Sequence, residues 1–118
     1  MKKPMVACAL AFLSFSFVAN AEPVRLGVEG TAPYASVPYG DLNLSNPAGA
    51  KVMMQRITFA ATRMCGGTPD IREIRERMMF KSCVHEAKND AVHQLNTPLV
   101  TELFLEEKAK EDQLASAD

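Results

Sequence analysis

Two cysteines, Cys65 and Cys83, constrain the fold of this chain more than any other feature of its sequence. A disulfide between them requires their Cα atoms to lie within about 7 Å of each other. A straight helix that began at Pro69 would carry Cys83 about 21 Å along its axis, because each helical residue rises about 1.5 Å. The chain between the cysteines therefore has to double back. We predict a short helical turn at residues 69–75, a bend at residues 76–78 and a long helix at residues 79–95.

The amino-terminal 21 residues have the pattern of a cleaved export signal. Lys2 and Lys3 precede a run of 14 almost entirely apolar residues, and residues 19–21 form the small-x-small triplet that signal peptidase accepts. A membrane anchor is the alternative, but it needs about 20 apolar residues. We predict cleavage between Ala21 and Glu22, a periplasmic or secreted location, and no transmembrane segment after cleavage.

Cleavage would remove Cys8 and leave Cys65 and Cys83 in an oxidising compartment. A lipoprotein is disfavoured, because Cys8 lies near the start of the apolar run and not after it. We expect a disulfide between the other two cysteines, which would stabilise the fold by about 3 kcal/mol. A redox-active pair or a metal site is the alternative. Neither is favoured, since no Cys-x-x-Cys spacing is present and two thiolates do not complete a zinc shell.

Charge is unevenly distributed along the predicted mature chain of 97 residues. Eleven bases against fourteen acids argue against nucleic acid as a partner. Residues 51–88 hold eight bases and four acids, whereas residues 102–118 hold six acids and two bases. We interpret the two regions as solvated helix faces that attract each other weakly, in preference to a binding patch.

Three capping residues stand directly before prolines, a pattern typical of helix starts: Asn46-Pro47, Thr68-Pro69 and Thr97-Pro98. The glycine pair at residues 66–67 and Asn96 are expected to end the first and second helices. The fold class predicted is all-α, a small disulfide-stapled helical bundle. Its two main helices span residues 47–64 and 79–95, and a short connecting helix and a C-terminal helix at residues 98–114 complete it. Apolar residues at the helical period are expected to face inward: Ala50, Met53, Ile57, Ala60, Ala61, Met64, Phe80, Cys83, Val84, Ala87, Ala91, Leu95, Leu99, Leu103, Phe104 and Leu105.

An extended arm is predicted ahead of the helices, because six prolines and glycines interrupt any helical period there. Val24, Leu26 and Val28 alternate with other residues, but an isolated hairpin is only marginally stable. We therefore expect the arm to lie on the helices, with Leu42 and Leu44 as its docking residues. The predicted divisions are a signal peptide at 1–21, the arm at 22–45, a helical domain at 46–114 and a disordered tail at 115–118.

Residues 37–50, Met64-Cys65-Gly66 and Cys83 followed by Asn96-Thr97-Pro98 resemble the UrcA family of small exported bacterial proteins. That family has a tyrosine, an Asp-Leu-x-Leu-Ser/Thr step, a Pro-Ala-Gly helix start and two cysteines. The matching motif positions are Tyr39, Asp41, Leu42, Leu44, Pro47 and Gly49, with Gly40 between the first two. The resemblance extends to about Phe104. It implies an exported helical domain with one disulfide, and it implies no particular reaction.

Two groups of polar residues are candidates for chemistry. Asp41 has a catalytic interpretation, but we favour hydrogen bonds from its carboxylate to backbone amides at the turn into the first helix. His85 and His93 are the only histidines, and their separation of eight positions corresponds to about 12 Å along a helix, too far for one ion. They are weak metal candidates, and we expect solvated surface groups.

Methionines and arginines offer two further candidates. Met53-Met54 and Met78-Met79 suggest copper(I), yet adjacent residues point in different directions and we expect at least one of each pair in the core. Five arginines are candidates for an anion or lipid-headgroup patch, although we favour a solvated face with a Glu73–Arg77 pair. They are Arg56, Arg63, Arg72, Arg75 and Arg77.

No recognisable catalytic set is present in the sequence. No serine or free cysteine stands in a nucleophile elbow, and neither histidine has an assigned partner. Our first hypothesis is a non-enzymatic exported protein without a cofactor, which acts in stress or through contact with an envelope protein or surface. The alternative is a periplasmic metal-binding or metal-buffering protein. A small enzyme would require a pocket with converging polar groups.

Overall fold

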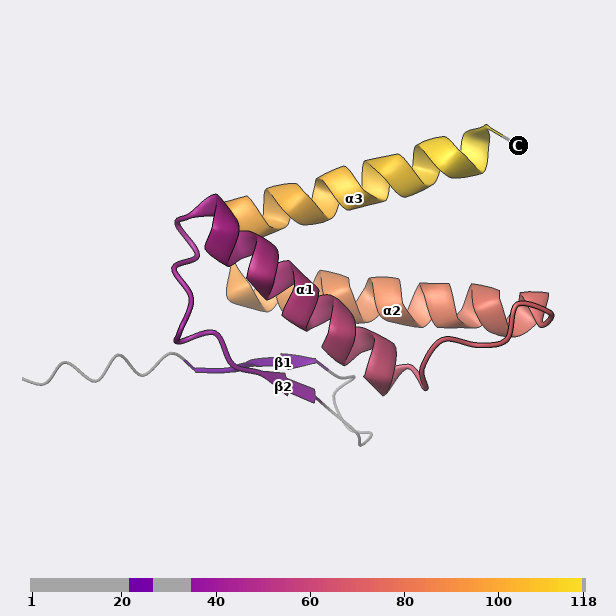
Figure 1. The fold of residues 1–118 in the computed structure, drawn as a ribbon, viewed down its shortest axis with the longest axis horizontal. Coiled ribbons are helices and arrows are strands. Elements are labelled where there is room, and N and C mark those ends of the chain that lie inside the picture. Colours follow the sequence, from indigo (N-terminus) through magenta and orange to yellow (C-terminus); the bar gives the residue numbers. More distant parts are fainter. Residues whose placement is uncertain (1–21, 27–34, 118) are drawn as a thin grey trace, which may run out of the picture.

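The structure is a computed structural model that describes residues 22–26 and 35–117 (Figure 1). The predicted export signal and Val28 lie outside these residues. Five elements follow one another along the chain: β1 (Val24–Leu26), β2 (Ala35–Val37), α1 (Pro47–Met64), α2 (Ile74–Leu95) and α3 (Pro98–Ser116). The fold is mostly helical, as predicted, but it has three helices and a small sheet in its described part.

Helix α1 begins and ends where the sequence predicts. The Asn46 side chain accepts a hydrogen bond of 2.9 Å from the Ala48 amide, and Pro47 occupies the first helical position. At the other end, Gly66 and Gly67 adopt positive φ angles of 92° and 82°. The Gly67 amide donates to the Thr62 carbonyl at 2.9 Å, which satisfies one of the last free carbonyls of the helix.

Helix α2 begins at Ile74, so the helix start predicted at Thr68-Pro69, the short connecting helix and the bend at residues 76–78 are wrong. The chain does double back, but in the loop that precedes the helix. Asp70 accepts from the Arg72 amide at 3.2 Å, and this local turn replaces a first helical turn. Residues 66–73 then return the chain, and one uninterrupted helix carries Cys83 to Cys65.

Helix α3 begins at Pro98, as predicted, after Asn96 ends α2 in a left-handed conformation with φ of 47°. The Thr97 hydroxyl caps no amide; it donates to the Leu95 carbonyl at 3.2 Å. The helix continues to Ser116, two residues beyond its predicted end and into the predicted tail.

The arm forms an antiparallel hairpin, with Val24 opposite Val37 and Leu26 opposite Ala35. A single extended arm was therefore too simple a prediction. Val24 and Leu26 are buried, and β1 packs on α2 while β2 packs on α1, which supplies the support that a lone hairpin lacks (Figure 1). The Gln94 side chain accepts from the Arg25 amide at 3.2 Å and donates to the Arg25 carbonyl at 2.6 Å, so it pairs with the backbone of β1.

The core lies where α1 faces α2, α3 and the hairpin. Met54, Val92 and Val100 are buried although they were not among the expected inward residues, and Leu105 is exposed although it was. The buried hydrophobic residues are Val24, Leu26, Val37, Ala50, Met53, Met54, Ile57, Ala61, Ala87, Ala91, Val92, Val100 and Phe104. Within residues 22–26 and 35–117, no helix combines the length and apolarity needed to cross a membrane.

Candidate functional site

The arm is tied to α1 by an exposed ion pair between Asp41 and Arg56. One guanidinium nitrogen of Arg56 donates to Asp41 Oδ1 at 2.8 Å and to the Pro38 carbonyl at 2.9 Å, and the other donates to Asp41 Oδ2 at 2.6 Å. The hydrogen bond from Arg56 is the main reason that the pKa of Asp41 lies below its usual value, and it raises the pKa of Arg56. Asp41 is thus occupied in holding the arm.

The role expected of Asp41 at the turn into α1 belongs instead to its neighbour Asn43. The Asn43 side chain accepts from the Ser45 amide at 3.1 Å. The backbone carbonyl of Asn43 accepts from the Asn46 amide, also at 3.1 Å. That carbonyl also approaches Gly49 so closely that a Cβ atom there would collide with it. A glycine at this position is therefore required by packing between the arm and α1.

Three other motif residues lie at the same junction. Tyr39, Leu42 and Leu44 are half-buried and pack against the core, so the predicted docking role of the two leucines is confirmed. Together with the ion pair and Gly49, these contacts account structurally for the motif positions. These residues do not bring together converging polar side chains of the kind that a reaction requires.

A groove of about 480 Å³ lies beside this junction, between β2 and the second half of α1. Phe59, Arg63 and Met64 line it together with the strand residues. The Arg63 guanidinium lies 5.7 Å from the centre of the exposed Phe59 ring, a cation–π distance. Since Arg56 is already bound to Asp41, Arg63 is the groove's arginine that makes no ion pair within the described residues.

The two histidines are not brought together. His85 is half-buried and its ring stacks on Phe104 with centroids 5.5 Å apart, whereas His93 is exposed. In the part of the chain that the structure describes, no group of three histidine, cysteine or acidic residues is arranged to hold a metal ion.

The methionine pairs behave differently from each other. Met53 and Met54 are both buried, but Met78 and Met79 are each 68% exposed, so the expectation of a core residue in every pair is wrong for the second. Both lie near the start of α2, ahead of the disulfide at Cys83.

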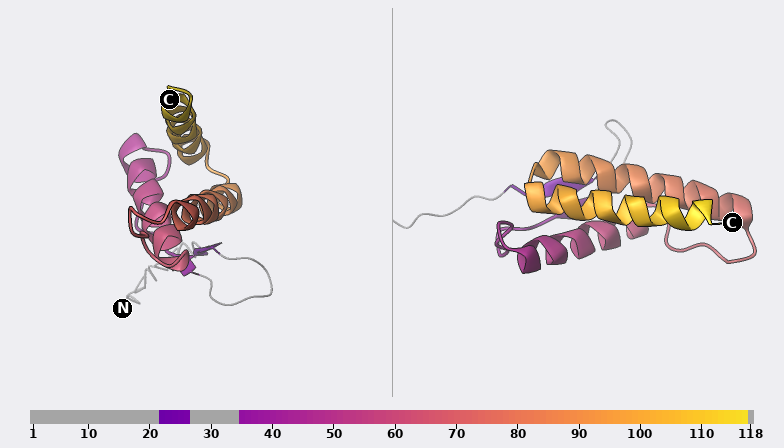
Figure 2. Two further views of the ribbon diagram at one scale, coloured as in Figure 1. Left: turned by 90° about the vertical axis from the view of Figure 1, so that its right-hand side faces the viewer. Right: turned by 90° about the horizontal axis from the view of Figure 1, so that it is seen from above.

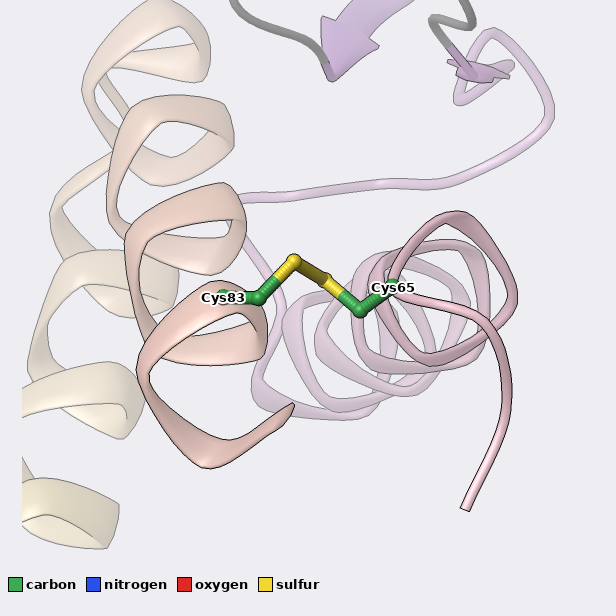
Figure 3. Close-up of a disulfide and its surroundings, with 2 residues drawn as sticks. All are labelled: Cys65 and Cys83. Atoms are coloured by element: carbon green, nitrogen blue, oxygen red, sulfur yellow. A yellow bond between two sulfur atoms is a disulfide. The ribbon is translucent and has the colours of Figure 1, made fainter. Parts of the chain in front are cut away.

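The disulfide sets the position of that surface. Cys65 caps the end of α1, and its Cα lies 5.9 Å from that of Cys83 in α2 (Figure 3). Every α2 residue before Cys83 therefore projects past the end of α1, by about 13 Å in all at 1.5 Å per residue. We call residues 71–81, which are the end of the preceding loop and the start of α2, the α2 tip.

The α2 tip combines exposed apolar side chains with bases. Phe80 is half-buried, whereas four of its large apolar residues are between 68% and 80% exposed: Ile71, Ile74, Met78 and Met79. Its four bases are Arg72, Arg75, Arg77 and Lys81, and none forms an ion pair within the described residues. The expected pair between Glu73 and Arg77 is not formed; the Arg77 amide donates to the Glu73 carbonyl instead.

Sequence reasoning found the charges of the tip and missed its apolar surface. The predicted short helix at residues 69–75 and the bend at residues 76–78 separated Ile71 and Ile74 from the long helix that begins at Met79. The available signal was Cys83 itself, because its bond to the end of α1 places the preceding α2 residues past that end.

The chain matches no family model, and neither a curated protein nor a solved structure shows significant similarity to it.

Proposed function

We propose that this chain is an exported, UrcA-like envelope protein that works without catalysis, by binding a partner through the α2 tip. The observation that carries the proposal is the exposure of four large apolar side chains at the α2 tip: Ile71, Ile74, Met78 and Met79. Large exposed apolar side chains gathered in one short segment and bordered by charge are typical of protein interaction sites. Export rests on the amino-terminal signal pattern, and the Cys65–Cys83 disulfide is compatible with it.

The disulfide supports this role because it rigidly anchors the base of the tip. A helix end of about ten residues would be marginal alone in water. Anchored at Cys83, it can present its apolar face at a smaller cost in conformational entropy on binding.

Export is tested by the intact mass of the protein recovered from the periplasm or medium, with and without reductant and alkylation. We expect a chain that begins at Glu22 and takes up two alkyl groups only after reduction. A chain that retains residues 1–21, or free thiols before reduction, would contradict the export part of the proposal.

Binding is tested by a photo-crosslinking amino acid placed at Ile74 in the full chain in cells, with Gln55 on the exposed face of α1 as the matched control position. We expect a discrete crosslinked product from position 74 that is absent from position 55. Equal labelling at both positions would overturn the proposed role of the tip, as would turnover of an envelope substrate that a single polar substitution abolishes.

A further inference from the structure

Helix α3 has an unpartnered end beside the α2 tip. Every residue from 105 to 117 is exposed, so no α3 side chain beyond Phe104 is buried, although Glu107 pairs with Lys88 of α2. We call residues 105–117 the α3 outer half. It carries the exposed Leu105 and Leu114, and its charges are four acids against two bases.

The two unpartnered helix ends project from the same end of the molecule. Helices α2 and α3 are antiparallel and diverge toward this end (Figure 1), and the end-on view shows them apart (Figure 2). Lys88 and Glu107, whose charged atoms lie 2.5 Å apart, form the ion pair between the two helices near the base of the divergence. A cleft of about 180 Å³ next to this pair is lined by Lys81 of α2 and Glu111 of α3.

The two ends are complementary in charge but do not satisfy each other within one chain. The α2 tip has four bases and two acids, the reverse of the α3 outer half. Within residues 22–26 and 35–117, neither Glu111 nor Asp112 forms an ion pair with the tip. The bases also lie near the positive end of the α2 macrodipole, and the acids near the negative end of the α3 macrodipole, so each cluster is slightly unfavourable where it stands.

We infer that the partner of the α2 tip is a second copy of this chain, which meets the first end to end about a two-fold axis. Each tip then lies on the α3 outer half of the other copy. Because a two-fold axis repeats every contact, the pairing of a tip with an outer half occurs twice in the dimer. The apolar side chains Ile74, Met78 and Leu114 fill its centre, and the arginines and acids surround them.

This arrangement relieves each of the unfavourable features. It gives the α3 outer half a packing partner, which a helical segment of this length needs in water. It also places opposite charges, and opposite helix ends, next to each other. Two helix ends per copy make an interface at the small end of the usual range, so we expect micromolar affinity and a strong dependence on salt.

The inference rests on the proposed function, and a charge-swap experiment tests it separately. One variant carries Arg75→Glu and Arg77→Glu; the other carries Glu111→Lys and Asp112→Lys. In either variant alone, the tip and the outer half have like charge, and we expect dimerisation at least about tenfold weaker than in the wild type. In a mixture of the two, each altered end meets its complement, and we expect the heterodimer to form.

Sedimentation velocity of the full mature chain, from micromolar to millimolar concentration at low and high salt, gives the dissociation constants. Asp90→Lys, an exposed reversal elsewhere on α2, is the control and should leave dimerisation unchanged. Circular dichroism establishes that each variant is folded. A wild type that stays monomeric throughout, or a mixture that fails to associate, overturns the inference.

Anionic vesicles of phosphatidylglycerol provide the competing outcome. If monomeric protein binds these vesicles and Arg75→Glu with Arg77→Glu abolishes binding, the tip recognises a lipid surface and the second-copy inference is wrong. If the chain is monomeric while position 74 still crosslinks specifically in cells, the proposed function stands and the inference alone fails.

Discussion

Arg56 holds Asp41 through two guanidinium nitrogens and uses one of them to hold the Pro38 carbonyl as well. One side chain of α1 thus fixes the loop that follows β2. The ion pair is exposed, so its contribution to stability is modest and sensitive to salt. The ion pair matters more for the placement of this loop on α1, because the same loop positions Leu42 and Leu44 against the core.

The first prediction concerns the pH dependence of this contact. The pKa of Asp41 is lowered in the fold, so the stabilisation is fully present above the unfolded value, near 3.8, and is lost as the pH falls through the folded pKa. NMR titration of the Asp41 carboxyl group should give a pKa below 3.8 in the wild type and a return toward that value in Arg56→Gln. Arg63→Gln, on the same helix, should leave it low. An unchanged pKa in Arg56→Gln would show that another group is responsible.

Gly49 provides the second prediction. Alanine is normally preferred to glycine inside a helix by about 1 kcal/mol. Here the added Cβ would meet the Asn43 carbonyl carbon and oxygen, which belong to backbone and cannot easily move. We expect Gly49→Ala to destabilise the fold by about 2 kcal/mol, measured by urea unfolding.

Ala48→Gly, at the exposed neighbouring position, is the control for helix propensity and should cost about 1 kcal/mol or less. If Gly49→Ala is as stable as the wild type or more so, the loop can move away from α1, and the close approach of the Asn43 carbonyl to Gly49 does not require a glycine.

Local chemistry made much of α1 and α3 predictable. Asn46-Pro47, the glycine pair at 66–67 and Asn96 act through backbone geometry within a few residues, and each lies where the sequence placed it. The start of α2 was not predictable in the same way. Thr68-Pro69 has the same local signature as the other two pairs. Here, however, the Asp70 side chain accepts from the Arg72 amide, and this turn takes the place of a first helical turn.

The candidate surfaces depend on long-range placement. Nothing near Asp41 in sequence indicates Arg56, which lies 15 residues away and reaches it only after α1 has formed. The excess of acids in the second half of α3 and the excess of bases at the α2 tip could both be counted in the sequence. Their position at one end of the molecule follows from two helix reversals and from the register that Cys83 imposes.

The third prediction concerns the disulfide. Replacement of Cys65 and Cys83 by alanine should lower the free energy of unfolding by about 3 kcal/mol, the chain-entropy value for a loop of this length. The effect should be greatest at the α2 tip, because most of its residues are exposed and the disulfide joins the residues that follow it to α1. Amide exchange should therefore accelerate more in residues 74–82 than in residues 87–95. Equal protection of the tip with and without the bond would show that the disulfide does not anchor it.

The last prediction concerns Gln94, whose side-chain amide bonds both backbone groups of Arg25 and so acts as a short third strand beside β1. Exposed strand edges are prone to pair with other chains, and Gln94 occupies this one. Gln94→Ala should cost about 1 kcal/mol of stability by thermal unfolding, the usual value for a hydrogen bond.

Gln94→Glu keeps the acceptor for the Arg25 amide but sets a carboxylate oxygen against the Arg25 carbonyl, so it should cost at least as much at neutral pH. Below the carboxyl pKa, the protonated side chain can donate again, and the Gln94→Glu variant should recover stability relative to Gln94→Ala. If the two variants show the same stability at every pH, the donor side of this contact contributes nothing.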